Sequence, residues 1–371
     1  MINVFLFAWD NYDDNPLDAI GVNTIPTQKE ATYAPSAEGE LVTDAFDTFM
    51  SNGDEYSYPQ VAEVAGEEPK VLVFGEGFIT PEPQPEPPSG KVCMYLEAAQ
   101  ANSTVRMVST LETAPNLEYS LDGETWREWN YTTDKGEPYT FDTITLGVVG
   151  DRVYFRGDNP NGLGFLPKGA QQPNFTNFVL TGEINGGGNI MSLLDKTMNL
   201  TEVPPFGFMG LFSIQGPDIE PALLTPPAMD NITSIGDSGC GSMYEECTSL
   251  LSTADMHALT TIGEGGCSSM YYACTSITAA AGMSALTTIN NGACSGMYVG
   301  CISITSAADM PAITTIGENG FSGMYYACTF NMSNDGTTLN FAFPTPPVTA
   351  GETTYATAYD VAEWMGNTNG F

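Results

Sequence analysis

The chain has 371 residues, of which 42% are hydrophobic and 11% aromatic, so it is too long for one ordinary domain and too apolar to be disordered. It carries 10 basic and 45 acidic side chains, and residues 197–371 contain 15 acidic side chains and no Lys or Arg. Such a surface repels phosphate, which argues against nucleic acid and anionic membranes as partners. Two interpretations of the charge stay open: solubility, and the binding of divalent cations or of a basic partner.

Residues 1–78 predict a small N-terminal unit of α+β type. Val4–Ala8 and Lys70–Phe74 have strand composition, and Thr43–Met50 predicts a short helix that ends at Ser51–Asp54. A unit of this size is near the lower limit for independent folding. We therefore expect either a small independent domain or an anchoring segment that attaches the chain to another particle.

Residues 79–90 predict a linker. Proline alternates with other residues from Pro81 to Pro87. This pattern favours polyproline II, a semi-rigid spacer of about 3 Å per residue. The linker is expected to hold the rest of the chain away from the N-terminal unit.

Residues 91–196 predict a β-sandwich of Ig-like type. Short apolar runs alternate with turn signals at spacings typical of such sandwiches. The runs are Val92–Leu96, Leu117–Ser120, Phe141–Leu146, Arg152–Arg156 and Asn177–Ile184, and the turns are Asp122–Gly123, Gly150–Asp151 and Gly186–Gly188. Ser120–Trp126 resembles the Asp-box turn of sialidase-like propellers, but it is one residue shorter and occurs once, so a hairpin turn with a packed tryptophan is the favoured interpretation.

A 27-residue repeat occupies about residues 232–330, inside a C-terminal region of residues 197–371. A fixed period of this size is typical of solenoids, in which each coil contacts only its neighbours. The matching segments are Ile232–Ile235, Leu259–Ile262, Leu286–Ile289 and Ile313–Ile316, and the pair Met243–Tyr244 recurs at 270–271, 297–298 and 324–325. Residues 197–231 and those after Cys328 lose the register, as terminal caps do. The C-terminal cap predicts a strand at Leu339–Phe343 and a helix within Thr354–Met365.

Within one repeat, Ser276–Thr278 and Leu286–Ile289 are β-branched and predict strands. Apolar residues at Cys267, Met270, Tyr271 and Cys274 have the spacing of one face of a helix or of a wide helical turn. Stacked coils must bury one face, so we interpret the Met–Tyr ladder as core and not as a ligand site.

Seven of the eight cysteines lie in the repeats. Since like positions stack over like in a solenoid, we predict that these cysteines are buried, free and packed as small hydrophobic side chains. A zinc site is the rival interpretation. It is disfavoured because Cys240 and Cys247 are too far apart for a zinc knuckle and His257 is the one histidine. The acidic loop Asp10–Asn15 lacks the glycine and the ligand spacing of an EF-hand, so no metal site is predicted there either.

The repeat resembles the BspA-like, or Treponema pallidum-type, leucine-rich repeats. The matching segments are Leu259–Gly263 and Met270–Thr278, and the Met-Tyr-x-x-Cys-Thr-Ser variant is similar to proteins of gut Bacteroidota and of their crAss-like phages. The segment 119–126 and the sequence Val153–Gly157 are similar to a domain that often precedes such repeats. The resemblance implies a C-terminal α/β leucine-rich-repeat solenoid in a multidomain, mainly β chain.

Residue pattern and resemblance together predict a structural virion protein of a phage, such as a head fibre, decoration protein or tail-associated fibre. The sequence contains no run of about 18 apolar residues, so no membrane span is predicted. The start of the chain has no basic region and only a short apolar stretch, so no export signal is predicted there. Bacterial relatives are surface proteins with such signals, so a cell-surface adhesin is the alternative.

We expect no enzyme activity and no catalytic, cofactor or metal site, because no phosphate loop, nucleophile elbow or HExxH motif occurs. The expected partners are capsid or tail proteins, bound through the N-terminal region, and a host-surface glycan or protein. Homo-oligomerisation stays open.

Overall fold

The computed structural model describes residues 92–133, 138–214, 222–332 and 338–366, and the backbone of four short strands before residue 73. The chain divides into two compact units, Met1–Glu86 and Pro87–Phe371. The strand predicted at Val4–Ala8, the acidic loop Asp10–Asn15 and the proline linker at 79–90 lie outside the described residues.

The N-terminal unit contains two described strand pairs, both antiparallel: β1 (Thr48–Ser51) with β2 (Asp54–Ser57), and β3 (Val61–Ala62) with β4 (Val71–Leu72). The helix predicted at Thr43–Met50 is therefore wrong at residues 48–50. The Asn52–Gly53 dipeptide that was interpreted as a helix end is also a strong hairpin signal, and the flanking segments pair as strands. The strand predicted at Lys70–Phe74 contains β4.

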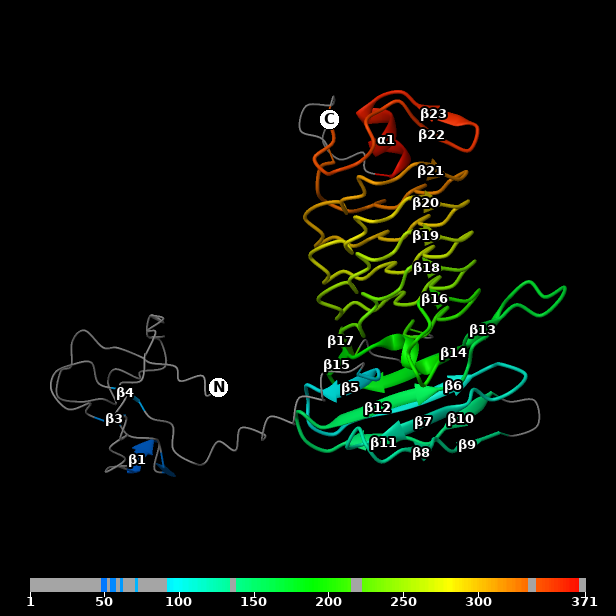
Figure 1. The fold of residues 1–371 in the computed structure, drawn as a ribbon. Helices are drawn as coiled ribbons and strands as arrows, with labels where there is room; N and C mark the ends of the chain where they lie inside the picture. Colours follow the sequence, from blue (N-terminus) through cyan, green and yellow to red (C-terminus); the bar gives the residue numbers. More distant parts are fainter. Residues whose placement is uncertain are drawn as a thin grey trace, which may run out of the picture. The chain divides into compact units, whose positions relative to one another are not determined.

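The second unit begins with two six-stranded sheets, here called the two-sheet module (Figure 1). The first sheet has the order β13-β14-β6-β10-β9, with β11 also paired to β6, and the second has the order β17-β15-β5-β12-β7-β8. The strands of the first sheet are β6 (Ser103–Ser109), β9 (Tyr131–Thr132), β10 (Tyr139–Phe141), β11 (Ile144–Leu146), β13 (Gly164–Phe165) and β14 (Asn174–Thr181). Those of the second are β5 (Tyr95–Ala98), β7 (Leu117–Ser120), β8 (Arg127–Glu128), β12 (Arg152–Gly157), β15 (Ile184–Gly187) and β17 (Leu223–Thr225).

Aromatic side chains fill the space between the two sheets. Phe155 of the second sheet lies 5.3 Å from Phe178 of the first, between ring centroids, and Trp129 lies 4.9 Å from Phe155. Strand β6 alternates buried and half-buried residues along its whole length, as expected for a strand with one face on a core. The predicted mainly β character is confirmed.

Most predicted strands of this module are present, with shifted ends. The run Leu117–Ser120 is β7, whereas Phe141–Leu146 is divided between β10 and β11. The turn predicted at Gly186–Gly188 is wrong at its first two residues, which belong to β15. Gly186 is needed for close approach, because a Cβ atom there would lie 2.7 Å from the carbonyl oxygen of Thr225 in β17.

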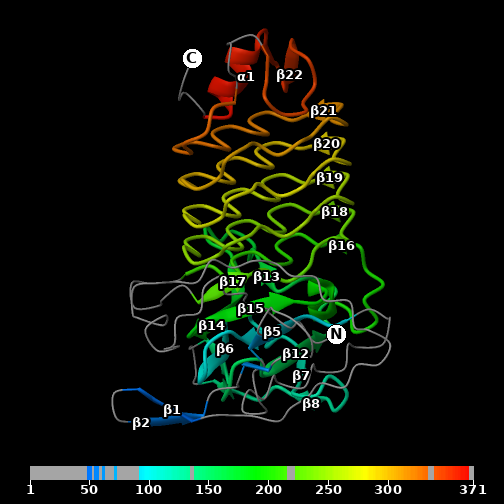
Figure 2. The same ribbon diagram turned by 90° about the vertical axis from the view of Figure 1, so that its left-hand side faces the viewer.

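Residues 200–214 and 222–332 form a stack of coils, here called the coil stack (Figures 1 and 2). Five two-residue strands pair in parallel, and Ser234, Thr261, Thr288 and Thr315 stand in register at intervals of 27 residues. The strands are β16 (Glu202–Val203), β18 (Ser234–Ile235), β19 (Thr261–Ile262), β20 (Thr288–Ile289) and β21 (Thr315–Ile316). No strand forms at Ser276–Thr278, where the chain turns, so that prediction is wrong.

The opposite side of each coil is a wide turn. In the second coil the amide of Met270 donates to the carbonyl of Cys267, and that of Cys274 to the carbonyl of Tyr271, so the bonds span three residues instead of four. Left-handed residues four positions apart prevent a helix from continuing. They are Ser238, Ser242 and Glu246 in the first coil, and Gly265, Ser269 and Ala273 in the second.

The last coil is covered by a C-terminal cap of β22 (Val348–Ala350), β23 (Thr353–Tyr355) and α1 (Ala358–Trp364). The amide of Tyr325 donates to the carbonyl of Met365 at 2.7 Å. The strand predicted at Leu339–Phe343 is wrong, since this segment is irregular. The helix predicted within Thr354–Met365 begins only at Ala358, because Thr357 and Asp360 form a capping box.

The two-sheet module is not confined to the residues before the boundary predicted at 196. Strand β17, which lies beyond it, pairs with β15 in the second sheet. The short 3₁₀ helix η1 (Ile190–Leu193) precedes the boundary, and its Ser192 hydroxyl accepts from the amide of Met94 at 2.9 Å. One continuous hydrophobic core therefore runs through both parts.

Candidate binding surface

The cysteines of the repeats lie in the core of the coil stack. All eight cysteines of the chain are free, and the seven in the repeats are buried. The Cys274 thiol donates to the carbonyl of Tyr244 at 3.0 Å, and Cys301 to that of Tyr271 at 3.0 Å. Burial raises the pKa of Cys247, Cys267 and Cys328 to about 12. The packing interpretation of these cysteines is confirmed.

A column of stacked aromatic rings joins the two-sheet module to the coil stack. Tyr271 lies 5.2 Å from Tyr244 and 5.5 Å from Tyr298, measured between ring centroids, and the rings are nearly parallel. The column continues through Phe212 to Phe178 of β14. The tyrosines of this column are fully buried, so the Met–Tyr ladder is core and offers no surface to a ligand.

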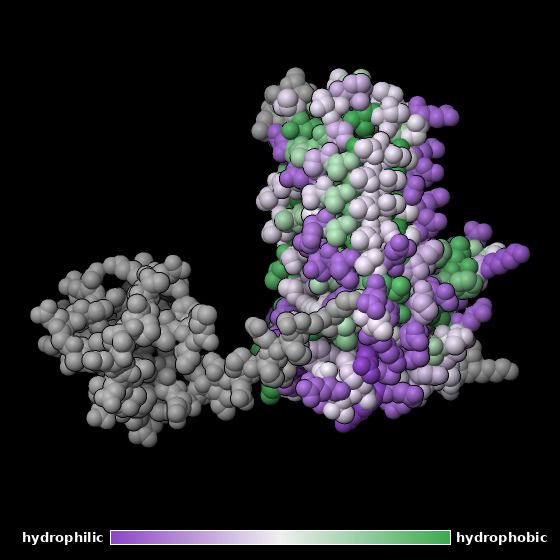
Figure 3. Space-filling model, in the orientation of Figure 1, coloured by the Kyte–Doolittle hydropathy of each residue, from purple (hydrophilic) through white to green (hydrophobic). Residues whose placement is uncertain are grey.

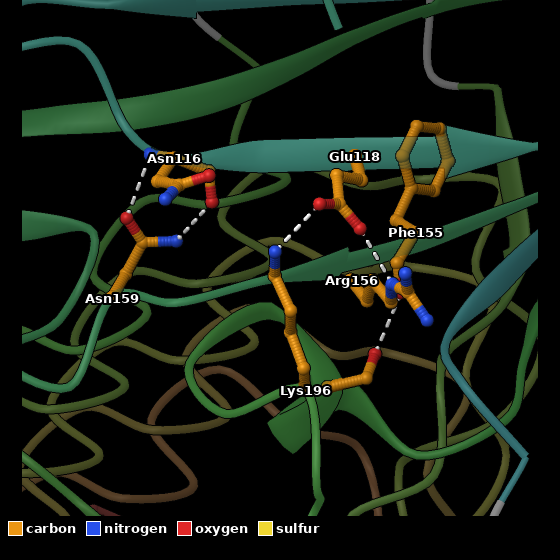
Figure 4. A network of polar contacts seen from close by, with 7 residues as sticks. Asn116, Glu118, Phe155, Arg156, Asn159 and Lys196 are labelled. Carbon is orange, nitrogen blue, oxygen red and sulfur yellow. Dashed lines mark hydrogen bonds and ion pairs between the residues drawn. The ribbon is translucent and has the colours of Figure 1, made fainter. Parts of the chain in front are cut away.

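Glu118 on β7 contacts two basic side chains, Arg156 and Lys196 (Figure 4). Its carboxylate lies 2.6 Å from Lys196 Nζ and 2.6 Å from Arg156 Nε. The hydrogen bond from Lys196 is the main cause that lowers the pKa of Glu118. The guanidinium of Arg156 lies 4.1 Å from the ring centroid of Trp126. These basic residues thus have partners within the fold.

Trp126 belongs to the turn between β7 and β8. The Asp122 carboxylate accepts hydrogen bonds from the amide of Thr125 at 2.6 Å, the hydroxyl of Ser120 at 2.7 Å and the amide of Glu124 at 2.8 Å, which lower the pKa of Asp122 well below its usual range. β7 and β8 pair antiparallel. The predicted hairpin turn with a packed tryptophan is confirmed.

A threonine ladder follows the strand side of the coil stack. Each threonine hydroxyl donates to the backbone carbonyl of the equivalent threonine one coil earlier. The ladder consists of Thr233, Thr260, Thr287 and Thr314, with distances of 3.2, 2.9, 3.0 and 3.2 Å. These hydroxyls stabilise the stack, which leaves fewer donors on this side for a ligand.

Most acidic side chains of the coil stack lie along two edges, and Glu245 and Glu246 lie on the wide turn of the first coil. One edge follows the strands and contains Asp237, Glu264 and Glu318, all exposed. The other precedes them and contains Asp230, Asp255 and Asp309, also exposed. Figure 3 shows the resulting hydrophilic margin beside a paler, partly hydrophobic face. His257 lies on the second edge, where its Nδ1 atom is 2.8 Å from Asp255.

The face made by the wide turns has no charge in three successive coils. The segments 265–281, 292–308 and 319–332 contain no Asp, Glu, Lys, Arg or His. Large apolar side chains are nevertheless exposed on it: Tyr272 is 37% exposed, Ile302 52% and Tyr326 62%. The sequence analysis missed this face, although the repeated Met-Tyr-Tyr at 270–272 and 324–326 marks a second tyrosine outside the buried column.

A cavity of about 350 Å³ lies at the C-terminal end of the coil stack. The rings of Phe330 and Phe341 and the polar side chains of Thr305, Asn331 and Asn340 line it. Among the described residues no group of three or more His, Cys, Asp or Glu is arranged to hold a metal ion. None of the helices in the described segments is long and apolar enough to cross a membrane.

Comparison with known proteins adds no relative: no family model, no curated protein and no solved structure matches the chain.

Proposed function

We propose that this chain is a structural protein of a bacteriophage virion, either a head fibre, a decoration protein or a tail-associated fibre, that displays the two-sheet module and the coil stack for host-surface binding. The observation that carries the proposal is the stack of 27-residue coils, in register from Ser234 to Thr315. Stacks of this kind offer an extended side to a partner, in contrast to the concave pocket of a typical enzyme.

The proposal includes the assignment of the coil stack to the BspA-like leucine-rich repeats. It is supported by the segment Leu259–Gly263, whose Thr261–Ile262 pairs in parallel with the next coil, and by Met270–Cys274, whose Met, Tyr and Cys side chains are buried. The two-sheet module is proposed to be of Ig-like sandwich type, supported by the ring contacts between its sheets.

The N-terminal region is proposed to bind capsid or tail proteins. Its support is the division of the chain into the units Met1–Glu86 and Pro87–Phe371 and the proline-rich sequence at residues 79–90. Alternating proline makes a semi-rigid spacer, which suits projection of the second unit away from a particle.

Complementation tests this assignment. A phage that lacks the gene is supplied with the full chain or with a chain that lacks residues 1–90, and purified particles are probed with an antibody against the coil stack. We expect the full chain in the particles and the shortened chain outside them. Incorporation of the shortened chain, with its melting temperature unchanged, would overturn the attachment role.

A bacterial cell-surface adhesin is the second candidate, supported by the same resemblance of the repeats. It predicts that the chain fractionates with the envelope of uninfected cells. In both candidates the chain binds a host-surface or environmental partner and catalyses no reaction.

A further inference from the structure

Tyr272, Val299 and Tyr326 form a column on the face made by the wide turns. The amide of Ala273 donates to the carbonyl of Val299 at 2.7 Å, and the amide of Gly300 to the carbonyl of Tyr326 at 2.9 Å. These bonds hold the three residues directly above one another in adjacent coils. Ile302 lies in the same coil as Val299 and extends the apolar area.

The two tyrosines of this column are exposed, unlike those of the buried column. Tyr272 and Tyr326 are two coils apart, which is about 10 Å, because neighbouring strands lie about 4.8 Å apart. Tyrosine has an apolar ring face and a polar hydroxyl, and it loses little conformational entropy when it binds. An exposed tyrosine ring on each side of the half-buried Val299 makes a platform that is long in the direction of the stack.

The three coils that carry the platform have no charged side chain on this face, whereas the preceding coil places Glu245 and Glu246 beside Tyr272, since the amide of Glu246 donates to the carbonyl of Tyr272 at 2.8 Å. Thr275, Ser276 and Thr329 follow it in the same turns, and they are half-buried or exposed. The Thr329 hydroxyl donates to the carbonyl of Ile302 at 2.7 Å, so it is left as a hydrogen-bond acceptor. The segments 265–281, 292–308 and 319–332 contain no charged side chain. The two acidic edges of the stack lie beyond these segments, and Figure 3 shows one hydrophilic margin of the stack beside a paler face.

We infer that this platform binds a neutral oligosaccharide chain, with sugar rings stacked on Tyr272 and Tyr326 and sugar hydroxyls bonded by the flanking Ser and Thr residues. A sugar ring has an apolar C–H face that matches an aromatic ring, and hydroxyl groups at its edge that match these side chains. The inference rests on the proposed display function, because it specifies the ligand of the displayed surface.

The charge of the stack favours a neutral oligosaccharide over an acidic polysaccharide or a basic protein. An acidic polysaccharide requires basic side chains, and residues 197–371 contain none. A basic protein would be attracted to the acidic edges and to Glu245 and Glu246 at one end of the platform, but Tyr272, Val299 and Tyr326 themselves would give it no ion pair. A neutral chain is the ligand whose polarity matches the platform.

The test measures binding of the purified full chain to immobilised neutral glucan, mannan and galactan, and to a polyuronate as the acidic comparison. We expect binding to at least one neutral polysaccharide, independent of salt between low and physiological ionic strength. The double variant Tyr272→Ala/Tyr326→Ala should weaken it at least tenfold. The ring-preserving variant Tyr272→Phe/Tyr326→Phe should keep most of it.

Tyr131→Ala is the matched control, since this tyrosine is 46% exposed but lies on the two-sheet module. Unchanged melting temperatures show that all variants fold. No binding to any neutral polysaccharide, undiminished binding by the double alanine variant, or salt-sensitive binding to the polyuronate alone would overturn the inference. If the chain is present in virions and binds none of the neutral polysaccharides, the inference fails and the virion role stands; if it binds them through the tyrosines but is absent from virions, the virion role fails.

Discussion

The backbone amide of Ala254 donates a hydrogen bond of 3.0 Å to the buried hydroxyl of Tyr271. The same bond, spanning 17 residues, recurs in the next two coils, from Ala281 to Tyr298 and from Ala308 to Tyr325, each at 2.9 Å. The first tyrosine of the column, Tyr244, has a buried hydroxyl without a partner. The residue 17 positions before it is Pro227, which has no amide hydrogen to donate.

Tyr271→Phe and Tyr244→Phe should therefore change stability in opposite directions. Removal of the Tyr271 hydroxyl leaves the buried amide of Ala254 unpaired, which costs about 1–3 kcal/mol. Removal of the Tyr244 hydroxyl relieves an unpaired buried group and should stabilise the protein by about 1 kcal/mol. Urea unfolding of both variants measures the free energies. Equal destabilisation by the two substitutions would show that the hydroxyl bond has no role.

Each wide turn ends in a residue with left-handed backbone conformation, and two equivalent residues of this kind allow a second pair of substitutions to be compared. Ala273 has a φ of 57°, and its counterpart Gly300 has a φ of 74°. Glycine adopts this conformation without strain, whereas alanine pays about 1 kcal/mol. Gly300→Ala should lower the free energy of unfolding and Ala273→Gly should raise it or leave it unchanged. A Cβ at Gly300 has room, since its nearest heavy atom would lie at 3.7 Å, so a loss of stability reports the backbone conformation.

Burial of the repeat cysteines predicts thiols that are inert in the folded protein. A thiol reagent at pH 8 should leave the seven buried cysteines unmodified and should label eight thiols after unfolding in urea. The reason is that the reactive species is the thiolate, and burial raises the pKa of these thiols. Rapid labelling of the seven in the native protein would contradict the buried arrangement.

The same raised pKa values predict that stability falls at alkaline pH. In the unfolded chain a thiol ionises near its ordinary value of 9.0, whereas Cys247, Cys267 and Cys328 in the fold ionise at about 12. Between these values the unfolded state binds fewer protons, so stability is full below about pH 9 and decreases as the pH rises. In this range each such thiol lowers the free energy of unfolding by about 1.4 kcal/mol per pH unit. Cys247→Ala should reduce the slope of the free energy of unfolding between pH 9 and 11, and an unchanged slope would contradict this account.

Glu118 should stabilise the second sheet at neutral pH. Its pKa is lowered, first by the hydrogen bond from Lys196, so its contribution is present above the unfolded pKa of about 4.3 and is lost as the pH falls through the folded value. Glu118→Gln should cost roughly 1–2 kcal/mol at pH 7. The difference from the wild type should shrink below about pH 4. The exposed Glu128 on β8 is the control, and Glu128→Gln should change the free energy of unfolding far less.

Sequence periodicity was sufficient to place the strand side and the core of the coil stack. Ile262, Met270, Tyr271 and Cys274 stand where the repeat predicted them, because a recurring apolar position must face the shared core. The sequence left open whether this segment is a helix or a wide helical turn. Both place apolar side chains at nearly the same spacing, so the pattern of apolar residues does not distinguish them. Only the left-handed backbone of residues such as Ser269 and Ala273 decides between them.

Features that depend on long-range pairing could not be predicted. One such feature is the close approach of β17 to Gly186, and another is the ion pair between Glu118 and Lys196; both bring together residues that are far apart in the sequence. A third is the exposure of Tyr326 next to the buried Tyr325, which depends on how the coils pack. Local propensity also failed at Thr43–Met50 and Leu339–Phe343. In the first the flanking Asn–Gly supports a hairpin, and in the second the cap forms its strands at Val348–Ala350 and Thr353–Tyr355 instead.

The central claim is that the chain is part of a virion, and peptide mapping of purified phage particles tests it most directly. Particles and the envelope fraction of uninfected host cells are digested and analysed by mass spectrometry side by side. The account predicts peptides from the two-sheet module and the coil stack in the particles, in constant ratio to the major capsid protein over successive gradient fractions. Peptides found only in the envelope of uninfected cells would contradict it and would favour the adhesin.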